Sequence, residues 1–170
     1  SVTSIGFSAF EGCTSLTSIT IPDGVTSICS SAFRGCTALT SITIPDNVTS
    51  VDDYVFDGCI SLTSITIPIS VTSIGSHAFY GCESLASIRI PAEVECIAVG
   101  AFSGCYRLKT ISFEENSKLQ SMPHTVLYHD RGGTSTIGVF KNMNISLVDM
   151  TNCKELKEIS GYTFGNNHYL

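Results

Sequence analysis

The sequence predicts an α/β-type repeat solenoid that is dominated by short parallel β-strands. Three observations predict this class. A valine recurs every 23 residues, at Val2, Val25, Val48, Val71 and Val94, with nearly everything between them repeated. The end of each unit alternates apolar and polar residues, as a half-buried strand does. A proline then follows at the same register in four units, where it ends the strand because it cannot donate a ladder hydrogen bond.

The repeat explains how the chain buries its apolar residues. Residues 2–24 and 25–47 differ at only five positions. Each unit offers the same apolar positions, which in the first are Val2, Ile5, Ala9, Phe10, Cys13, Leu16, Ile19 and Ile21. No single unit can enclose these side chains. Stacking encloses them, because the identical sets above and below cover each unit.

Within a unit, L-T-S-I-T-I predicts a short strand with Ile19 and Ile21 inward and Ser18 and Thr20 outward. V-T-S-I predicts a second brief extended piece. A-F-x-G-C is too short for a full helix and predicts a helical or 3₁₀ turn. We expect the units to stack as a parallel sheet at a spacing of roughly 4.8 Å.

The last third keeps the repeat with a different consensus sequence. Leu108, Ile111 and Phe113 continue the strand pattern, and Glu114 replaces the proline. Residues 123–136 interrupt the repeat with Pro, two His and a Gly pair, and predict a surface loop. We therefore expect one solenoid over 1–170, with regular 23-residue repeats over 2–116 and irregular repeats with an insertion over 117–170. The chain ends partway through a repeat, so we expect a fragment of a longer repeat chain.

Composition excludes several classes of protein. Charged residues make up 14% and hydrophobic residues 43%, with a mean hydropathy of +0.27, which excludes intrinsic disorder. The longest run without charged or strongly polar side chains, residues 96–102, is far too short for a bilayer helix, so we expect no membrane insertion. The net charge of −6 disfavours nucleic acid as a partner.

Residues 22–44 and 68–90 both carry P-x-x-V-x-x-I-x-x-x-A-F-x-x-C-x-x-L-x-x-I-x-I. In this string the chain resembles the BspA-like leucine-rich repeat proteins. The resemblance implies a right-handed superhelix with a parallel sheet. It also implies an extracellular or cell-surface location and a protein, cell-surface or matrix ligand. The late units resemble the commoner leucine-rich spelling, in which Asn116 and Cys153 would satisfy backbone groups at the turn.

Five of the eight cysteines recur at the repeat period, at Cys13, Cys36, Cys59, Cys82 and Cys105. In a column their Cβ vectors would be parallel, which gives the wrong torsion for a disulfide, so buried reduced thiols are predicted. Cys29 and Cys96 are three units apart, too far to pair. The chain has no C-x-x-C pair, which disfavours zinc, and we expect neither a metal nor a cofactor.

No pattern predicts catalysis. His129 and Asp130 could join a serine in a triad, but the chain lacks a G-x-S-x-G elbow and these residues predict a polar loop. Asp52, Asp53 and Asp57 do not follow the D-x-D-x-D-G spacing of a calcium loop and predict a solvated acidic turn. Two N-x-S/T sequons, at Asn47 and Asn144, permit glycosylation if the source is a secreted eukaryotic protein.

The candidate ligand-binding face consists of the outward strand positions, namely Ser18, Thr20, Ser41, Thr43, Ser64, Thr66, Ser87, Arg89, Thr110 and Ser112. These small hydroxyls either merely suit exposed strands or form a recognition surface of the kind that solenoids use. Arg89, Arg107 and Lys109 would give this face one charged end.

The leading functional hypothesis is a non-catalytic protein-binding or adhesion module. An alternative is a structural subunit that self-associates end to end into a filament or surface layer, because neither terminus carries a polar capping unit. A third is ice binding by the regularly spaced Ser-x-Thr pairs. That activity needs a flat face, whereas leucine-rich solenoids usually curve, and thermal hysteresis would test it.

Overall fold

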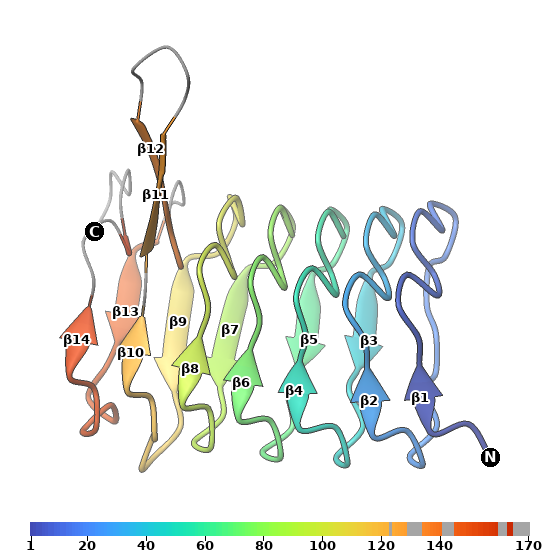
Figure 1. Ribbon diagram of the computed structural model, residues 1–170, viewed down its shortest axis with the longest axis horizontal. Helices are drawn as coiled ribbons and strands as arrows, with labels where there is room; N and C mark the ends of the chain where they lie inside the picture. The colour runs from blue at the N-terminus through green and yellow to red at the C-terminus, as the bar shows by residue number, and fades with distance from the viewer. Residues whose placement is uncertain (123, 129–133, 141–144, 160–162, 165–170) are drawn as a thin grey trace.

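The chain forms a parallel β-solenoid of about five turns, seen side-on in Figure 1. The structure is a computed structural model that describes residues 1–122, 124–128, 134–140, 145–159 and 163–164. Within these ranges the chain has strands and turns but no helix, and therefore no helix that could span a membrane. The strands lie in two rows whose arrows point in opposite directions, because each turn of the chain runs up one side and down the other.

The first row is built from the V-T-S-I segments and is the nearer one in Figure 1. β1 pairs in parallel with β2, and β4, β6, β8, β10 and β14 form a five-stranded sheet in that spatial order. Paired residues are 23 positions apart in the regular turns, as in Ser50 with Ser73. The bounds are β1 (Ser4–Ile5), β2 (Ser27–Ile28), β4 (Ser50–Val51), β6 (Ser73–Ile74), β8 (Cys96–Ile97), β10 (Ser121–Met122) and β14 (Glu158–Ile159).

The second row is built from the S-I-T segments that the alternation predicts. β3 (Ser41–Thr43) pairs with β5 (Ser64–Thr66), and β7 (Ser87–Ile90), β9 (Thr110–Phe113) and β13 (Leu147–Asp149) form a three-stranded sheet. All of these pairs are parallel. The isoleucines of this row point into the core and its hydroxyl residues point out. Residues 18–20 have no regular strand, although the Thr40 N–H donates to Thr17 O at 3.1 Å.

The A-F-x-G-C segment forms a turn between the two rows, with hydrogen bonds of the 3₁₀ type that the sequence predicts but without a regular helix. The N–H groups of Glu11 and Cys13 donate to the carbonyls three residues earlier, at 3.0 and 3.1 Å, as a 3₁₀ turn requires. However, Ser8 and Gly12 have φ angles of 53° and 70°. These left-handed residues break the helical run and aim alternate N–H groups at the next turn of the solenoid, as in Phe10 N–H to Ala32 O at 2.8 Å.

A single column of phenylalanine rings fills the core. Successive rings are stacked, with centroids 5.1–5.6 Å apart. The five rings from Phe33 to Phe140 are fully buried. Leucine, valine, isoleucine and alanine columns at the other repeat positions complete the core. The members of the ring column are Phe10, Phe33, Phe56, Phe79, Phe102, Phe140 and Phe164.

The interruption of the repeat is a hairpin, not only the loop that the sequence predicts. β11 (His124–Tyr128) pairs antiparallel with β12 (Thr134–Gly138). The hairpin is inserted between β10 and Val139–Phe140, which occupy the A-F positions of the turn, and it projects from the same edge of the solenoid as the other turns (Figure 1). The regular packing resumes directly after it, because the Phe102 N–H donates to Val139 O at 3.0 Å and Phe140 continues the ring column.

Candidate functional site

The outward hydroxyl positions lie together on the second row, in the register that the repeat predicts. Ser41 faces Ser64 and Thr43 faces Thr66 across β3 and β5. Ser87 faces Thr110, and Arg89 faces Ser112, across β7 and β9. The eight positions from Ser18 to Arg89 are exposed, and Thr110 and Ser112 are half-buried. The strands thus form one surface of short hydroxyl side chains, which we call the hydroxyl face. Its members are Ser18, Thr20, Ser41, Thr43, Ser64, Thr66, Ser87, Arg89, Thr110 and Ser112.

Two shallow hollows border the hydroxyl face at the ends of its strands. One of about 220 Å³ lies between Thr20, Thr43 and Pro45. The other, of about 180 Å³, lies between Thr66, Arg89 and Glu114. Each hollow joins two neighbouring turns of the solenoid, so a bound side chain could touch both at once.

The positive charge at one end of the hydroxyl face is partly neutralised by a carboxylate. Arg89 is exposed, and its Nε lies 3.0 Å from Glu114 Oε1. Glu114 occupies the position where earlier units have proline, and the repeat register brings it beside Arg89 from the preceding unit. Arg107 and Lys109 are also exposed. This end therefore presents an ion pair together with two further bases.

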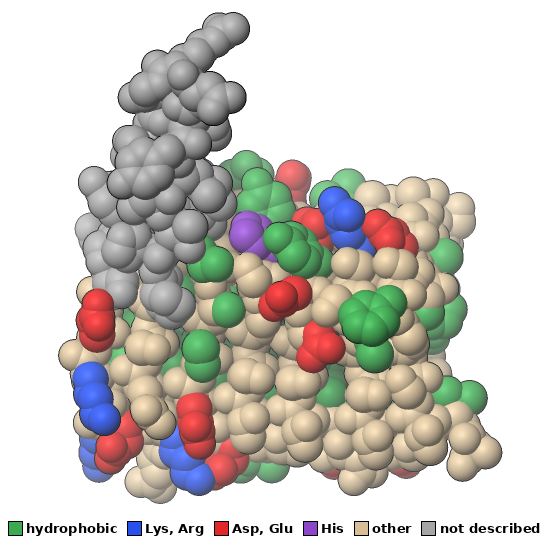
Figure 2. Space-filling model, viewed as in Figure 1, with side chains coloured by type: hydrophobic (Ala, Val, Ile, Leu, Met, Phe, Trp, Pro, Cys, Tyr) green, Lys and Arg blue, Asp and Glu red, His purple; other side chains and the backbone are tan. Residues whose placement is uncertain are grey.

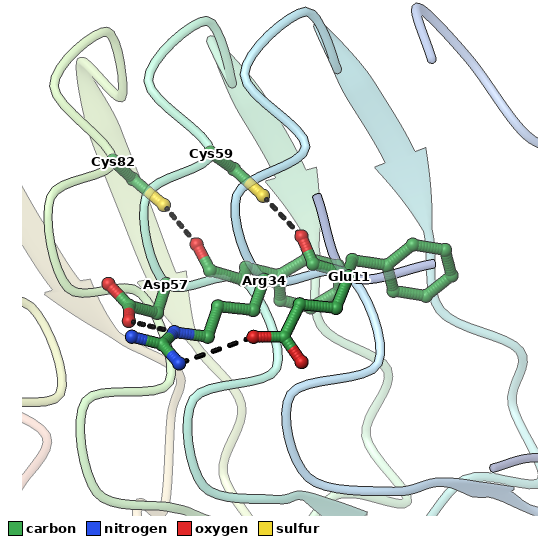
Figure 3. A network of polar contacts seen from close by, with 7 residues as sticks. Glu11, Arg34, Asp57, Cys59 and Cys82 are labelled. Atoms are coloured by element: carbon green, nitrogen blue, oxygen red, sulfur yellow. Dashed lines mark hydrogen bonds and ion pairs between the residues drawn. The ribbon is translucent and has the colours of Figure 1, made fainter. Parts of the chain in front are cut away.

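The cysteine column is unbridged, as predicted, and all eight cysteines are free thiols. Cys36, Cys59, Cys82 and Cys105 are buried, whereas Cys13 in the first turn is exposed. Each buried thiol donates to the carbonyl of the phenylalanine 26 residues earlier, at 3.1–3.2 Å, as Figure 3 shows for Cys59 and Cys82. The thiol is therefore a hydrogen-bond donor as well as an apolar filler, a role that sequence reasoning missed.

Burial makes these thiols difficult to ionise. It raises the pKa of Cys59 to about 12 and that of Cys105 to about 12. Burial also raises the pKa of Cys82 well above its usual range. Because the thiolate is the nucleophile and the metal ligand, these raised pKa values disfavour both roles for Cys59, Cys82 and Cys105 at neutral pH.

The three aspartates of the acidic turn bond to different partners, and their carboxylates do not point to a common cation site. Asp52 Oδ1 accepts from Ser50 Oγ at 2.9 Å, and Asp53 Oδ1 accepts from the Ser76 N–H at 2.6 Å. Asp57 Oδ2 lies 2.9 Å from Arg34 Nε. Within the described residues there is no group of three or more possible metal ligands.

Arg34 connects three turns of the solenoid by ion pairs. Its side chain lies between Asp57 on one side and Glu11, at 3.3 Å, on the other (Figure 3). The three residues are 23 positions apart, so they form a column of alternating charge. Hydrogen bonding to Asp57 is the main cause of the raised pKa of Arg34. The pairs are half-exposed and contribute little to stability.

The other candidates from the sequence are placed as follows. Asn47 is exposed, and its Nδ2 donates to Asp23 O at 2.8 Å. Asn144, His129 and Asp130 lie outside the described residues. The turn expected at Asn116 and Cys153 is built differently, because Asn116 is exposed with a φ of 59°. Asn152 Nδ2 satisfies Phe113 O instead, and Cys153 Sγ lies 3.9 Å from Ser117 Oγ.

Sequence reasoning also missed a cluster of aromatic side chains on the turns. Tyr54 stacks on His77 with ring centroids 5.1 Å apart, and Tyr80 lies tilted against His77 at 5.4 Å. Tyr54 and Tyr80 are 39% and 43% exposed. We call these three residues the aromatic cluster. Tyr54 and His77 are visible in the repeat register as replacements of the serines of the first two units, whereas Tyr80 falls in the column of Arg34 and Asp57.

Two rows of stacked parallel strands, with identical side chains in columns between them, define a leucine-rich repeat solenoid. The family model described as BspA type leucine rich repeat region (6 copies) matches residues 3–129. The chain therefore belongs to the BspA-type leucine-rich repeat family. The match covers all five regular units and confirms the resemblance drawn from the two repeat strings.

Three solved structures of bacterial leucine-rich repeat proteins share this fold. A protein of T. pallidum has a TM-score of 0.67 and 28% identity, over 97% of this chain and 63% of that one. A protein of Bacteroides ovatus has a TM-score of 0.64 and 31% identity, over 96% and 42%. A cell surface protein of Faecalibacterium prausnitzii has a TM-score of 0.65 and 33% identity, over 94% and 51%.

The chain spans less than two thirds of the length of each of these three structures. Among curated proteins the comparison finds no match.

Proposed function

We propose that the chain is a non-catalytic protein-binding or adhesion module of a secreted or cell-surface protein. The hydroxyl face carries this proposal, because its side chains lie in strict register across neighbouring turns and are exposed. Such an array gives a partner a repeated set of hydrogen-bond donors and acceptors on a rigid support. The description of the Faecalibacterium relative as a cell surface protein supports the proposed location.

The position of the face agrees with this role. Its side chains project from a sheet whose other side is the apolar core, so a substitution on the face leaves the packing intact. The hollows beside Thr43 and Arg89 add depth at two places along the face. A ligand that spans several turns would contact both hollows.

Thr43→Arg is expected to reduce binding to immobilised host-matrix or host-cell extracts at least several-fold while leaving the melting temperature almost unchanged. The long arginine side chain would cover the neighbouring hydroxyl groups of the face. Thr43 is exposed, and substitutions at exposed positions cost little stability. Ser27→Arg is the matched control, because it adds the same charge at an exposed position of β2 in the first row. Biolayer interferometry with each purified variant measures the difference.

Arg89→Glu extends the test to the charged end, where it would remove the pair with Glu114 and reverse the charge. It is also expected to weaken binding. Equal binding by wild type, Thr43→Arg and Arg89→Glu would move the binding site to another surface.

A second candidate function is end-to-end self-assembly, and one observation favours it. Beside the first turn, Ile5, Phe10, Ile19 and Ile21 line an apolar hollow of about 330 Å³. Another turn with the same repeat sequence would fit this hollow, whether it belongs to an earlier repeat of a longer chain or to a second copy, because each turn of the solenoid is covered by its neighbour in this way. A contact between dissimilar ends need not close and would propagate.

Aspartate at both Ile19 and Ile21 is expected to abolish such assembly, because the new charges would be buried against the incoming turn. Sedimentation velocity and negative-stain microscopy at high concentration compare this variant with the wild type. Fibres or concentration-dependent oligomers of the wild type alone would support the assembly function. A monodisperse wild type, unchanged by the substitutions, would exclude it.

A further inference from the structure

Two members of the aromatic cluster occupy left-handed backbone positions that large side chains seldom adopt. Tyr54 and His77 have φ angles of 59° and 55°, in the left-handed region. In the first two turns the same position holds the small residues Ser8 and Ser31, with φ angles of 53° and 60°. Histidine is tolerated in this region, whereas a residue as bulky as Tyr54 is costly there and persists where a site requires it. The fold does not require aromatic rings here, because serine serves in the neighbouring turns.

The following turn provides room for the rings. Gly100 occupies the equivalent position one turn after His77, and a Cβ there would lie 2.7 Å from His77 Nε2. The missing side chain lets the His77 ring lie over the backbone of Gly100 while its other face stacks on Tyr54. Successive turns thus hold Tyr54 and His77 as a parallel pair, with Tyr80 at an angle to them.

A neighbouring hydroxyl and burial both act on the His77 ring. Ser76 Oγ donates to Val99 O at 3.1 Å and lies 3.0 Å from His77 Nδ1. Burial lowers the pKa of His77, outweighing the opposite effects of Asp57 and Asp53. The lowered pKa favours the neutral ring, which can stack as an uncharged aromatic surface.

The charge around the cluster is negative. Asp53 and Asp57 act electrostatically on His77, and Asp57 also pairs with Arg34 at 2.9 Å. Residues 1–88 contain seven acids and a single base, Arg34. Hydrophobic, histidine and acidic side chains gather over the turns along the upper edge of the molecule in Figure 2. Arg34 shows which side chain suits this edge, because its guanidinium is held there between two carboxylates.

We propose that Tyr54, His77 and Tyr80 form a docking surface for the guanidinium groups of a basic segment of a partner protein. Guanidinium is planar, stacks on aromatic faces and pairs with carboxylates, so it matches both the rings and their acidic surroundings. The surface lies on the turns, away from the hydroxyl face, and so adds a second contact region to the proposed module. The β11–β12 hairpin projects from the same edge and stands beside the approach to it.

A hexa-arginine peptide tests this proposal, with hexa-lysine as the control for charge alone. Isothermal titration calorimetry is expected to give tighter binding of hexa-arginine than of hexa-lysine, because lysine cannot stack as a plane. The double variant Tyr54→Ser, His77→Ser restores the residue type of the first two turns and leaves the charge at pH 7.5 unchanged. It is expected to weaken hexa-arginine binding about tenfold, since each exposed ring contributes a factor of about two to five.

Two further variants give the test its specificity. Tyr106→Ser removes another exposed tyrosine, one without a ring contact among the described residues, and is expected to leave binding unchanged. Tyr54→Phe with His77→Phe keeps both rings and is expected to retain binding. Circular dichroism and the melting temperature check that each variant folds. Tyr80→Ser removes the third ring of the aromatic cluster by itself.

Three results would overturn the proposal. One is equal binding of hexa-arginine by the wild type and the serine variant. Another is equal affinity of the wild type for hexa-arginine and hexa-lysine, because charge alone would then explain binding. The third is ring-dependent binding of a neutral oligosaccharide, such as maltohexaose, in place of the peptides, which would assign the rings to carbohydrate stacking.

Discussion

Phe33→Ala is expected to lower the free energy of unfolding by about 3–5 kcal/mol. Phe33 is fully buried and stacks between Phe10 and Phe56, at centroid distances of 5.1 and 5.6 Å. Its loss would leave a cavity in the ring column and remove both contacts. The neighbouring rings cannot close the gap, because backbone hydrogen bonds such as Phe33 N–H to Val55 O fix the spacing between turns. Urea denaturation followed by circular dichroism measures the change.

Phe7→Ala is the matched control for this substitution. Phe7 belongs to the turn of the first unit but is 76% exposed, so its removal is expected to change stability by no more than about 0.5 kcal/mol. A loss below about 1 kcal/mol for Phe33→Ala would contradict the shared ring column as the main source of core packing.

The second large effect is a loss of stability in alkali. The pKa of Cys59 and of Cys105 is raised from 9.0 to about 12 in the folded chain. The folded state therefore holds these protons more tightly than the unfolded state does. Stability is fully present below the unfolded value of 9.0 and falls as the pH rises from there toward about 12. At pH 10.5 each thiol is expected to cost about 2 kcal/mol, since one pKa unit corresponds to about 1.4 kcal/mol.

Urea denaturation at pH 8 and pH 10.5, under a reducing agent, measures this loss. Exposed groups titrate equally in the wild type and in Cys59→Ala with Cys105→Ala, so the double variant isolates the buried thiols. Its stability is expected to be lower at pH 8, because a cavity replaces each thiol, but to fall less between the two pH values. The same pH dependence in both proteins would show that these thiols are not buried in the folded chain.

The repeat predicts most of the fold. Once one residue is correctly assigned as buried or exposed, the equivalent residues of the other units follow. Phe33, Cys59 and Ile88 are buried, and Ser41 and Thr43 are exposed, as the 23-residue register requires. The turn was harder to predict. A-F-x-G-C has the composition of a helical turn, and only the positive φ angles of residues such as Ser31 prevent one, at a residue type that does not by itself signal this conformation.

Features that depend on two neighbouring units were less visible in the sequence. The pair of Arg89 with Glu114 arises only once the register sets one unit beside the next. The aromatic cluster likewise requires knowing that residues 23 apart are adjacent and that Gly100 leaves space. The β11–β12 hairpin interrupts the period, so the repeat gave no information about it, and its glycine pair indicated only a turn.

Hydrogen exchange with mass spectrometry tests most directly whether the hydroxyl face is the binding surface. The chain is compared free and saturated with the matrix or cell-surface fraction that binds it most tightly. We expect slower exchange in peptides that cover β3, β5, β7 and β9, and unchanged exchange in those that cover β2, β4 and β6. Protection confined to β2, β4 and β6, with none in the second row, would contradict this expectation.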